Sequence, residues 1–238
     1  MTATYLRLVG AALLSGAVAG AQTNNPLESA SVRQPHEYGV LVQGGTGLTD
    51  NRGDFKFAMA GLHAGRVLTN NYSIGPVRGN FEYAVEVFPY WQSFTPKFQR
   101  VSCRLAPGTG APTCSQPYAV GGTYDGIIIT PIILRVNFAA QGRVTPWIQG
   151  AGGVLWTNHK YPAYGDTTPN LTTNGPNGDA SVWNFTPQAG VGMHYFTRPD
   201  RSIDVSANAI HISSASLGDR NPGVNVTLQF SVGYTWWK

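Results

Sequence analysis

The feature that most constrains the fold is a two-residue alternation of apolar and polar side chains. In residues 224–236, every second position from Val226 to Trp236 is apolar or aromatic, and the intervening positions include Thr227 and Gln229. Successive side chains of a β-strand point to opposite faces, so this pattern predicts a strand with one apolar and one polar face. The pattern recurs along the chain and indicates an all-β protein.

Eight segments carry signals of extended structure. They are residues 38–46, 55–69, 80–92, 125–139, 144–157, 182–196, 201–214 and 224–236. Several are longer than the usual globular strand of about 5–6 residues. They suit tilted strands that cross a bilayer, which need about 9–11 residues each. We therefore predict an eight-stranded antiparallel transmembrane β-barrel of the outer membrane.

The lengths of the connections support this fold. From the first segment onward they are 8, 10, 32, 4, 24, 4 and 9 residues. If the N-terminus is periplasmic, the two tight turns at 140–143 and 197–200 are periplasmic and both long loops face outward. Outer-membrane barrels have short periplasmic turns and longer outer loops. A soluble β-sandwich has no reason to sort its loops in this way.

The composition agrees with a membrane barrel and excludes some partners. Charged residues make up 12 % of the chain, about half of the roughly 25 % in soluble domains. After the N-terminal segment, no apolar run approaches the ~20 residues that a spanning helix needs. The formal net charge of +4 is too small to indicate nucleic-acid binding.

The N-terminus has the pattern of an export signal. Arg7 precedes an apolar stretch at residues 8–18, and Ala19, Gly20 and Ala21 form a small-residue cleavage site. We expect a cleaved signal peptide at 1–21, a linker at 22–37 and the barrel at 38–238. The alternative, an N-terminal membrane anchor, is disfavoured because the apolar stretch is short and its flanks are wrong.

Two cysteines, Cys103 and Cys114, lie in the longest loop, which is rich in glycine and proline. In an oxidising compartment such a pair is expected to form a disulfide. The alternative is a two-ligand metal site. No histidine or third cysteine lies nearby in the sequence, and the histidines elsewhere lack ligand spacing, so we expect neither a metal nor a cofactor.

An eight-stranded barrel is too narrow for a pore, so side chains must fill its interior. Glu82, Glu86 and Asp204 fall on inner faces, where an unpaired charge costs several kcal/mol. Arg135 is the obvious cation to pair with them. A structural ion-pair network is favoured over the alternative of a proton path.

The seventh segment carries the candidate chemistry. Asp204 and the alternate positions after it are natural interior residues, which places His211 and Ser213 on the outer face. This strand runs outward, so the pair lies at the depth of the outer-leaflet headgroups. A serine hydroxyl becomes a good nucleophile when a histidine takes its proton. Two polar residues where a strand leaves the membrane are the alternative explanation.

Residues 211–215, His-Ile-Ser-Ser-Ala, are followed by Asn221-Pro222-Gly223-Val224-Asn225 and the terminal strand. This arrangement resembles the C-terminal signature of the PagL-type lipid A 3-O-deacylases, within a broader acyloxyacyl hydrolase-like family. The specific part of the resemblance spans residues 211–225. It implies an outer-membrane enzyme of Gram-negative bacteria that removes an ester-linked 3-hydroxyacyl chain from the lipid A of lipopolysaccharide.

By position, the resemblance implies Ser213 as the nucleophile and His211 as the general base. Two positions depart from the family pattern. Ser214 stands where the best-known members have an asparagine that helps to stabilise the oxyanion. Asn225 stands where they have the acidic residue that orients the histidine. An asparagine holds an imidazole by hydrogen bonding, but it supplies no negative charge to an imidazolium.

Two other functions compete with this esterase. The chain is alternatively a non-catalytic small outer-membrane barrel that acts in stability, adhesion or binding through loops 93–124 and 158–181, or a secreted β-barrel that binds a lipid. The partners we expect are lipid A, lipopolysaccharide and the lipids of the outer membrane, without nucleic acid. The sequence leaves a homodimer open.

Overall fold

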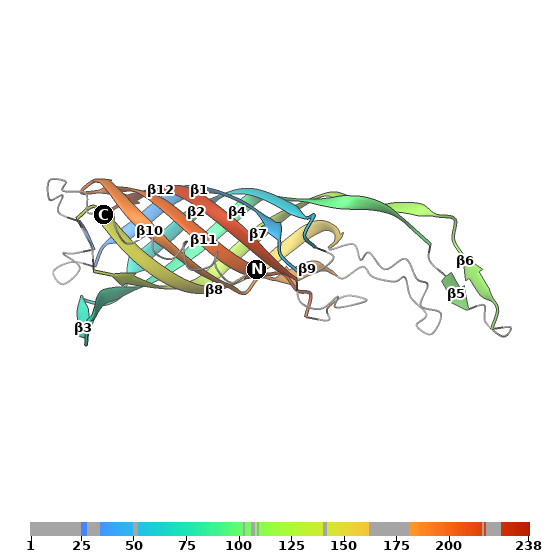
Figure 1. The fold of residues 1–238 in the computed structure, drawn as a ribbon, viewed down its shortest axis with the longest axis horizontal. Helices are drawn as coiled ribbons and strands as arrows, with labels where there is room; N and C mark the ends of the chain where they lie inside the picture. Colours follow the sequence, from blue (N-terminus) through green and yellow to red (C-terminus); the bar gives the residue numbers. More distant parts are fainter. Residues whose placement is uncertain are drawn as a thin grey trace, which may run out of the picture.

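The computed structural model describes residues 25–27, 34–49, 52–101, 103–105, 108, 110–139, 142–161, 181–215, 217 and 225–238. These residues form a closed eight-stranded antiparallel β-barrel, which confirms the predicted fold class (Figure 1). The predicted signal peptide and most of the predicted linker lie outside the described residues. No helix among the described residues is long and apolar enough to cross a membrane.

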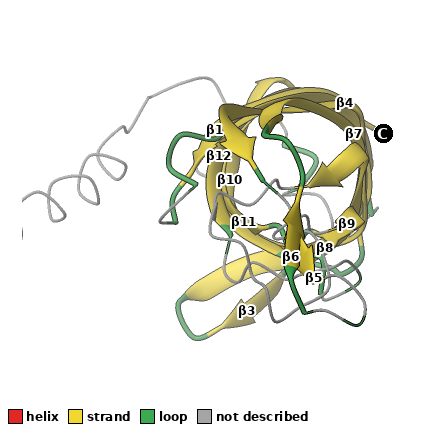
Figure 2. Cartoon of the chain, turned by 90° about the vertical axis from the view of Figure 1, so that its right-hand side faces the viewer, coloured by secondary structure: helices red, strands yellow, loops and turns green. Residues whose placement is uncertain are grey.

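The barrel wall is built from consecutive antiparallel neighbours, and Figure 2 shows the ring from one end. Its strands are β1 (His36–Gly47), β2 (Lys56–Val67), β4 (Val77–Arg100), β7 (Tyr118–Phe138), β8 (Val144–Tyr161), β9 (Ser181–Phe185), β10 (Gln188–Arg198), β11 (Arg201–His211) and β12 (Val226–Trp237). β12 pairs with β1, and β10 pairs with β8, so the wall has no open edge. A short strand, β3 (Tyr72–Ile74), extends β4 into a hairpin.

The predicted sixth segment, 182–196, is interrupted in the structure. It consists of β9 and β10, and Thr186 and Pro187 lie between them. Proline has no N–H to donate to a neighbouring strand, which accounts for the interruption. β8 pairs with both pieces, so the two together form one strand of the wall.

Residues 93–124, predicted as a loop, are largely β-structure. β4 pairs with β2 only as far as Phe94, and beyond it β4 and β7 pair with each other up to Arg100 and Tyr118. The ribbon continues into a hairpin of β5 (Cys103–Leu105) and β6 (Pro112–Cys114), joined by the expected Cys103–Cys114 disulfide. An isolated two-stranded ribbon is marginally stable. The disulfide restricts the unfolded chain and thereby stabilises this one.

The two ends of the barrel differ. The C-terminus and the β3 hairpin lie at one end, and the ribbon with β5 and β6 projects from the other (Figure 1). The short connections after β7 and β10 lie at the first end. This is the sorting of connections that the sequence predicts.

The outer wall is apolar around the barrel. Large apolar side chains that are more than a third exposed occur on every strand of the wall: Tyr38, Val40, Val42, Leu62, Phe81, Tyr83, Val87, Ile127, Ile129, Ile132, Leu134, Ile148, Trp156, Trp183, Phe185, Val191, Ile203, Phe230 and Val232. Such a surface is costly in water and matches the hydrocarbon of a bilayer.

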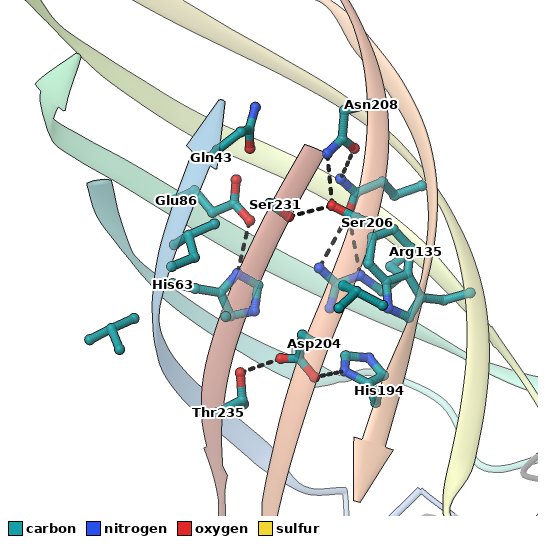
Figure 3. Close-up of a pocket in the computed structure, with 16 residues that line it drawn as sticks. Gln43, His63, Glu86, Arg135, His194, Asp204, Ser206, Asn208, Ser231 and Thr235 are labelled. Atoms are coloured by element: carbon teal, nitrogen blue, oxygen red, sulfur yellow. Dashed lines mark hydrogen bonds and ion pairs between the residues drawn. The ribbon is translucent and has the colours of Figure 1, made fainter. Parts of the chain in front are cut away.

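The middle of the interior is polar and ion-paired (Figure 3). Arg135 Nη1 lies 2.6 Å from Glu82 Oε1 and 3.3 Å from Glu37 Oε1. The predicted pairing of Arg135 with Glu82 is therefore present. The guanidinium also stacks over Trp147, 4.4 Å from the ring centre.

Glu86 and Asp204 pair with histidines, although the sequence pointed to Arg135 for all the inner acids. His63 Nδ1 is 3.2 Å from Glu86 Oε1, and its Nε2 contacts Glu37. His194 Nδ1 is 2.8 Å from Asp204 Oδ1. The guanidinium of Arg135 contacts Glu82 and Glu37, and Glu86 and Asp204 lie too far from it to be paired by the same group. The cavity beside these groups has a volume of about 30 Å³, room for little more than a water molecule.

Apolar clusters close the interior on both sides of this polar band. The cluster toward the ribbon contains Phe55, Phe57, Met59, Phe88, Trp91, Tyr124, Ile128, Leu155, Tyr161, Ile210 and Ile212. The cluster at the other end contains Leu27, Val67, Phe196 and Trp237. Leu27 comes from the predicted linker, and β1 begins at His36, also inside that predicted range. The interior is thus filled by side chains and forms no pore.

We predict that Arg135→Met destabilises the barrel by about 3–5 kcal/mol, because it leaves Glu82 buried without its cation and leaves Glu37 with His63 alone. The control is Arg201→Met, since Arg201 pairs with the exposed Asp200 at the barrel rim and should have no measurable effect. Urea unfolding in lipid vesicles measures both. Equal stability of the two variants would contradict the role given to Arg135.

Candidate active site on the outer wall

The segment that follows β11 is held between two neighbouring strands. Ser213 N–H donates to Phe185 C=O at 3.1 Å, and Phe185 N–H donates to Ser213 C=O at 2.7 Å. His211 N–H donates to Pro187 C=O at 2.9 Å. On the other side, Ile212 N–H donates to Asn225 C=O at 2.9 Å. The segment therefore continues the wall past the last residue of β11 and has a defined position.

The alternation of β11 continues through this segment. Ile210 and Ile212 are buried in the interior cluster, so His211 and Ser213 belong to the opposite, outward face. Both side chains are partly exposed. They lie at the end of the barrel that carries the ribbon, away from the short connections. The structure thus places these two residues on the face and at the end that the sequence predicts.

Ser214 and Asn225 have the other orientation. Ser214 is fully buried and Asn225 is 1 % exposed, and both fall in register with the interior residues of their strands. The side-chain amide of Asn225 has no hydrogen-bond partner among the described residues. Asn225 instead reaches His211 through its main chain, whose N–H donates to Nδ1 at 3.4 Å. The expected side-chain contact between Asn225 and the histidine is therefore absent, because the side chain faces the interior and only the main chain reaches His211.

This contact has a consequence for the histidine. A nitrogen that accepts a hydrogen bond carries no proton, so Nδ1 is the acceptor in this contact. In a Ser-His-carboxylate triad, the carboxylate accepts a hydrogen bond from Nδ1–H and leaves Nε2 free to take the serine proton. The main-chain N–H of Asn225 is a donor at Nδ1, where such a triad has an acceptor, so it does not take the role of the carboxylate.

A main-chain group that the sequence did not indicate also contacts the Ser213 side chain. The main-chain N–H of Ala215 donates to Ser213 Oγ at 3.2 Å. Ala215 has a positive φ of 47°. An alanine carries no sequence signal of that conformation, in contrast to a glycine at a turn, so only the structure shows this contact.

An apolar groove of about 400 Å³ lies on the outer wall near Ser213. Its lining consists of Ile127, Ile129, Val154, Trp156 and Trp183. Register connects it with the serine: Ser213 is opposite Phe185, and Phe185 is opposite Val154 on the next strand. Two strand spacings correspond to about 10 Å. The sequence does not indicate this groove, because the groove depends on pairing across the three strands β7, β8 and β9.

Among the described residues, one group inside the barrel has the composition of a metal site. Glu37, His63 and Glu82 offer ligand atoms that lie within 4.8 Å of one another. Arg135 already pairs with both carboxylates through Nη1, and His63 contacts Glu37. The charges of this group are balanced by protein cations, and we assign it a structural role.

Fold and site together define a β-barrel whose candidate serine and histidine face outward from an apolar wall. A family model described as lipid A 3-O-deacylase (PagL) matches residues 77–235, more than half of the chain. The chain belongs to the PagL family of lipid A 3-O-deacylases. No curated protein matches it.

Solved structures with similar folds include the outer-membrane enzyme PagL, with 15 % identity, a TM-score of 0.48, and coverage of 83 % of this chain and 98 % of that one. The N-terminal barrel of Pseudomonas aeruginosa OprF has 10 % identity and a TM-score of 0.39, covering 84 % of this chain and 97 % of its own. Yersinia pestis Ail has 9 % identity and a TM-score of 0.44, covering 86 % and 99 %.

We predict that Asn225→Glu lowers stability and does not raise activity, because the new carboxylate would be buried in the interior without a cation. Asn225→Ala, which keeps the main-chain N–H at His211, should change the deacylation rate by no more than about twofold. Lipid A mass spectrometry and urea unfolding of both variants test this. A faster Glu variant would show that the side chain reaches the histidine.

Proposed function

We propose that this protein is a serine esterase that removes an ester-linked 3-hydroxyacyl chain from lipid A in the outer leaflet. The observation that carries the proposal is the outward orientation of His211 and Ser213 at the ribbon end of an apolar wall. An ester next to a lipid headgroup is accessible from that side of the barrel. Membership of the PagL family supports the same reaction.

The reaction has two steps. His211 takes the proton of Ser213 Oγ while the oxygen attacks the ester carbonyl of the substrate, forming a tetrahedral intermediate. Its collapse breaks the ester bond and returns the proton to the lipid A hydroxyl that leaves. Water, activated by the same histidine, then hydrolyses the acyl-serine and releases a 3-hydroxy fatty acid. These steps need no cofactor.

The apolar groove supports an acyl-chain substrate. It opens on the same wall as Ser213, two strands away, and its lining of aliphatic and aromatic side chains has no polar member. Phe185 lies between the groove and Ser213 and is 42 % exposed. An acyl chain in this groove would place its ester toward the serine.

The same proposal includes the location of the protein. An apolar belt on all sides of the barrel and short connections at one end suit the outer membrane of a Gram-negative bacterium, with the ribbon outward. Export through a cleaved signal peptide at 1–21 belongs to this proposal. The lipids around the wall would then include the substrate itself.

We predict that expression in a bacterium that makes lipopolysaccharide removes one 3-hydroxyacyl chain from its lipid A, and that Ser213→Ala and His211→Ala abolish the loss. Removing the nucleophile or the base of a serine–histidine pair lowers the rate by a factor of about 10⁴–10⁶. Lipid A mass spectrometry gives the readout.

The matched controls are Ser73→Ala and His36→Ala, which change exposed residues at the opposite end of the barrel. Heat-dependent gel mobility shows that every variant has folded and inserted. Unchanged lipid A with correctly folded wild-type protein would refute the proposal. Equal activity of the Ser213→Ala and Ser73→Ala variants would show that Ser213 is not the nucleophile.

We predict that Ile129→Trp, which fills the groove, lowers kcat/KM for lipid A about tenfold, because loss of two buried methylene contacts already has this effect. A short-chain soluble ester should be hydrolysed as before. Leu134→Trp is the control, since Leu134 is an exposed residue of the same strand outside the groove. Equal effects on both substrates would show that the groove holds no acyl chain.

A further inference from the structure

Ala215 has an unusual backbone. It is the one residue other than glycine with a positive φ in the part of the chain that the structure describes, at 47°. This left-handed region is unfavourable for an L-residue with a Cβ atom, and such residues concentrate at functional sites. Ala215 lies two residues after Ser213, next to the candidate nucleophile.

The surroundings of Ala215 define this conformation through the main chain. On one side of it, Ser213 is paired with Phe185 of the neighbouring strand. On the other side, Leu217 N–H donates to Ser214 C=O at 2.9 Å and closes a turn around Ala215. The Ala215 side chain is exposed and therefore has little packing to lose. The backbone is bent at this position by a turn that follows directly on the wall.

The effect of the turn is to direct the N–H of Ala215 toward the serine. Its nitrogen lies 3.2 Å from Ser213 Oγ. We propose that the Ala215 main-chain N–H is a positioning group that orients Ser213 Oγ for its attack on the substrate. This inference rests on the proposed role of Ser213 as a nucleophile.

The donor acts on the position of Oγ. The N–H of Ala215 holds one lone pair of Oγ at 3.2 Å, which restricts the rotation of the serine side chain and keeps the oxygen in one place on the outer face. A nucleophile held in a reactive orientation reacts faster than one that samples several rotamers. The side chain of Ser214 is buried on the interior face, so it lies on the wrong side of the wall for this role.

The test uses Ala215→Val, Ala215→Gly and the control Ala119→Val. Valine is strongly disfavoured at positive φ, whereas glycine adopts it freely and keeps the N–H. Ala119 is exposed in strand β7 of the ribbon, where valine is well tolerated. The first readout is the rate at which a fluorophosphonate labels Ser213 in detergent-solubilised protein. The second is kcat and KM on purified lipid A in micelles.

We expect Ala215→Val to slow labelling and kcat by at least about tenfold with KM unchanged. Ala215→Gly should react at the wild-type rate or faster, and Ala119→Val should match the wild type. Ala215→Val should lower the unfolding temperature slightly, because valine is strained at positive φ, so labelling and kcat are measured well below that temperature. The side chain is exposed, so no packing is lost in any variant.

Equal labelling of the Val and Gly variants would overturn the inference, and so would a wild-type protein whose Ser213 is not labelled. If the wild type is labelled at Ser213 but leaves lipid A intact, the proposed substrate is wrong. The labelling rates of the Ala215 variants still decide the role of the N–H in that case.

Discussion

The structure depends on one constraint: a wall surrounded by hydrocarbon must pair its own N–H and C=O groups from strand to strand. Closure of β12 on β1 and of β10 on β8 meets this requirement. Once the strands are paired, alternation decides which side chains face lipid and which face the interior. A shift by one residue would exchange these faces along a whole strand. The outward position of His211 and Ser213 therefore follows from the register of the entire wall.

The candidate chemistry lies where this regular pairing ends. β9 and β10 are interrupted at Thr186 and Pro187, and β11 ends at His211, so the main chain there departs from a simple ladder. The departures release N–H groups from strand pairing. Those of Asn225 and Ala215 donate to the histidine and the serine. Main-chain donors thus lie beside both candidate residues.

The interior of the barrel is held together by ion pairs between strands. Four acids, Glu37, Glu82, Glu86 and Asp204, are distributed over the polar band with Arg135 and two histidines as their partners. Their pairing bridges strands that are distant in the sequence, such as β1 and β7. The cross-links hold the cylinder in shape while the outer wall remains apolar and available to lipid.

The sequence predicted those features that depend on local pattern. Alternation located the strands, and parity placed His211 and Ser213 on the outer face. It did not reveal the partners of Glu86 and Asp204, since His63 and His194 reach them through strand register. Nor did it show that β4 and β7 continue beyond the barrel, because residues 93–124 have the composition of a loop.

The site was predictable as a pair of residues but not as a geometry. The direction of the Asn225 side chain follows from parity, and its main-chain contact with His211 does not. The positive φ of Ala215 has no sequence signal. Backbone conformation at the end of a strand is decided by what the neighbouring strands leave unpaired, and a single sequence contains this information only through the complete fold.

The central claim is that Ser213 attacks the ester and carries the acyl group. Rapid acid quenching of the protein during turnover of lipid A, followed by peptide mass spectrometry, tests it directly. The account predicts a 3-hydroxyacyl adduct on the peptide that contains Ser213 and no adduct in the Ser213→Ala variant. An acyl group on another residue, or release of the fatty acid with no adduct under any quench time, would contradict it.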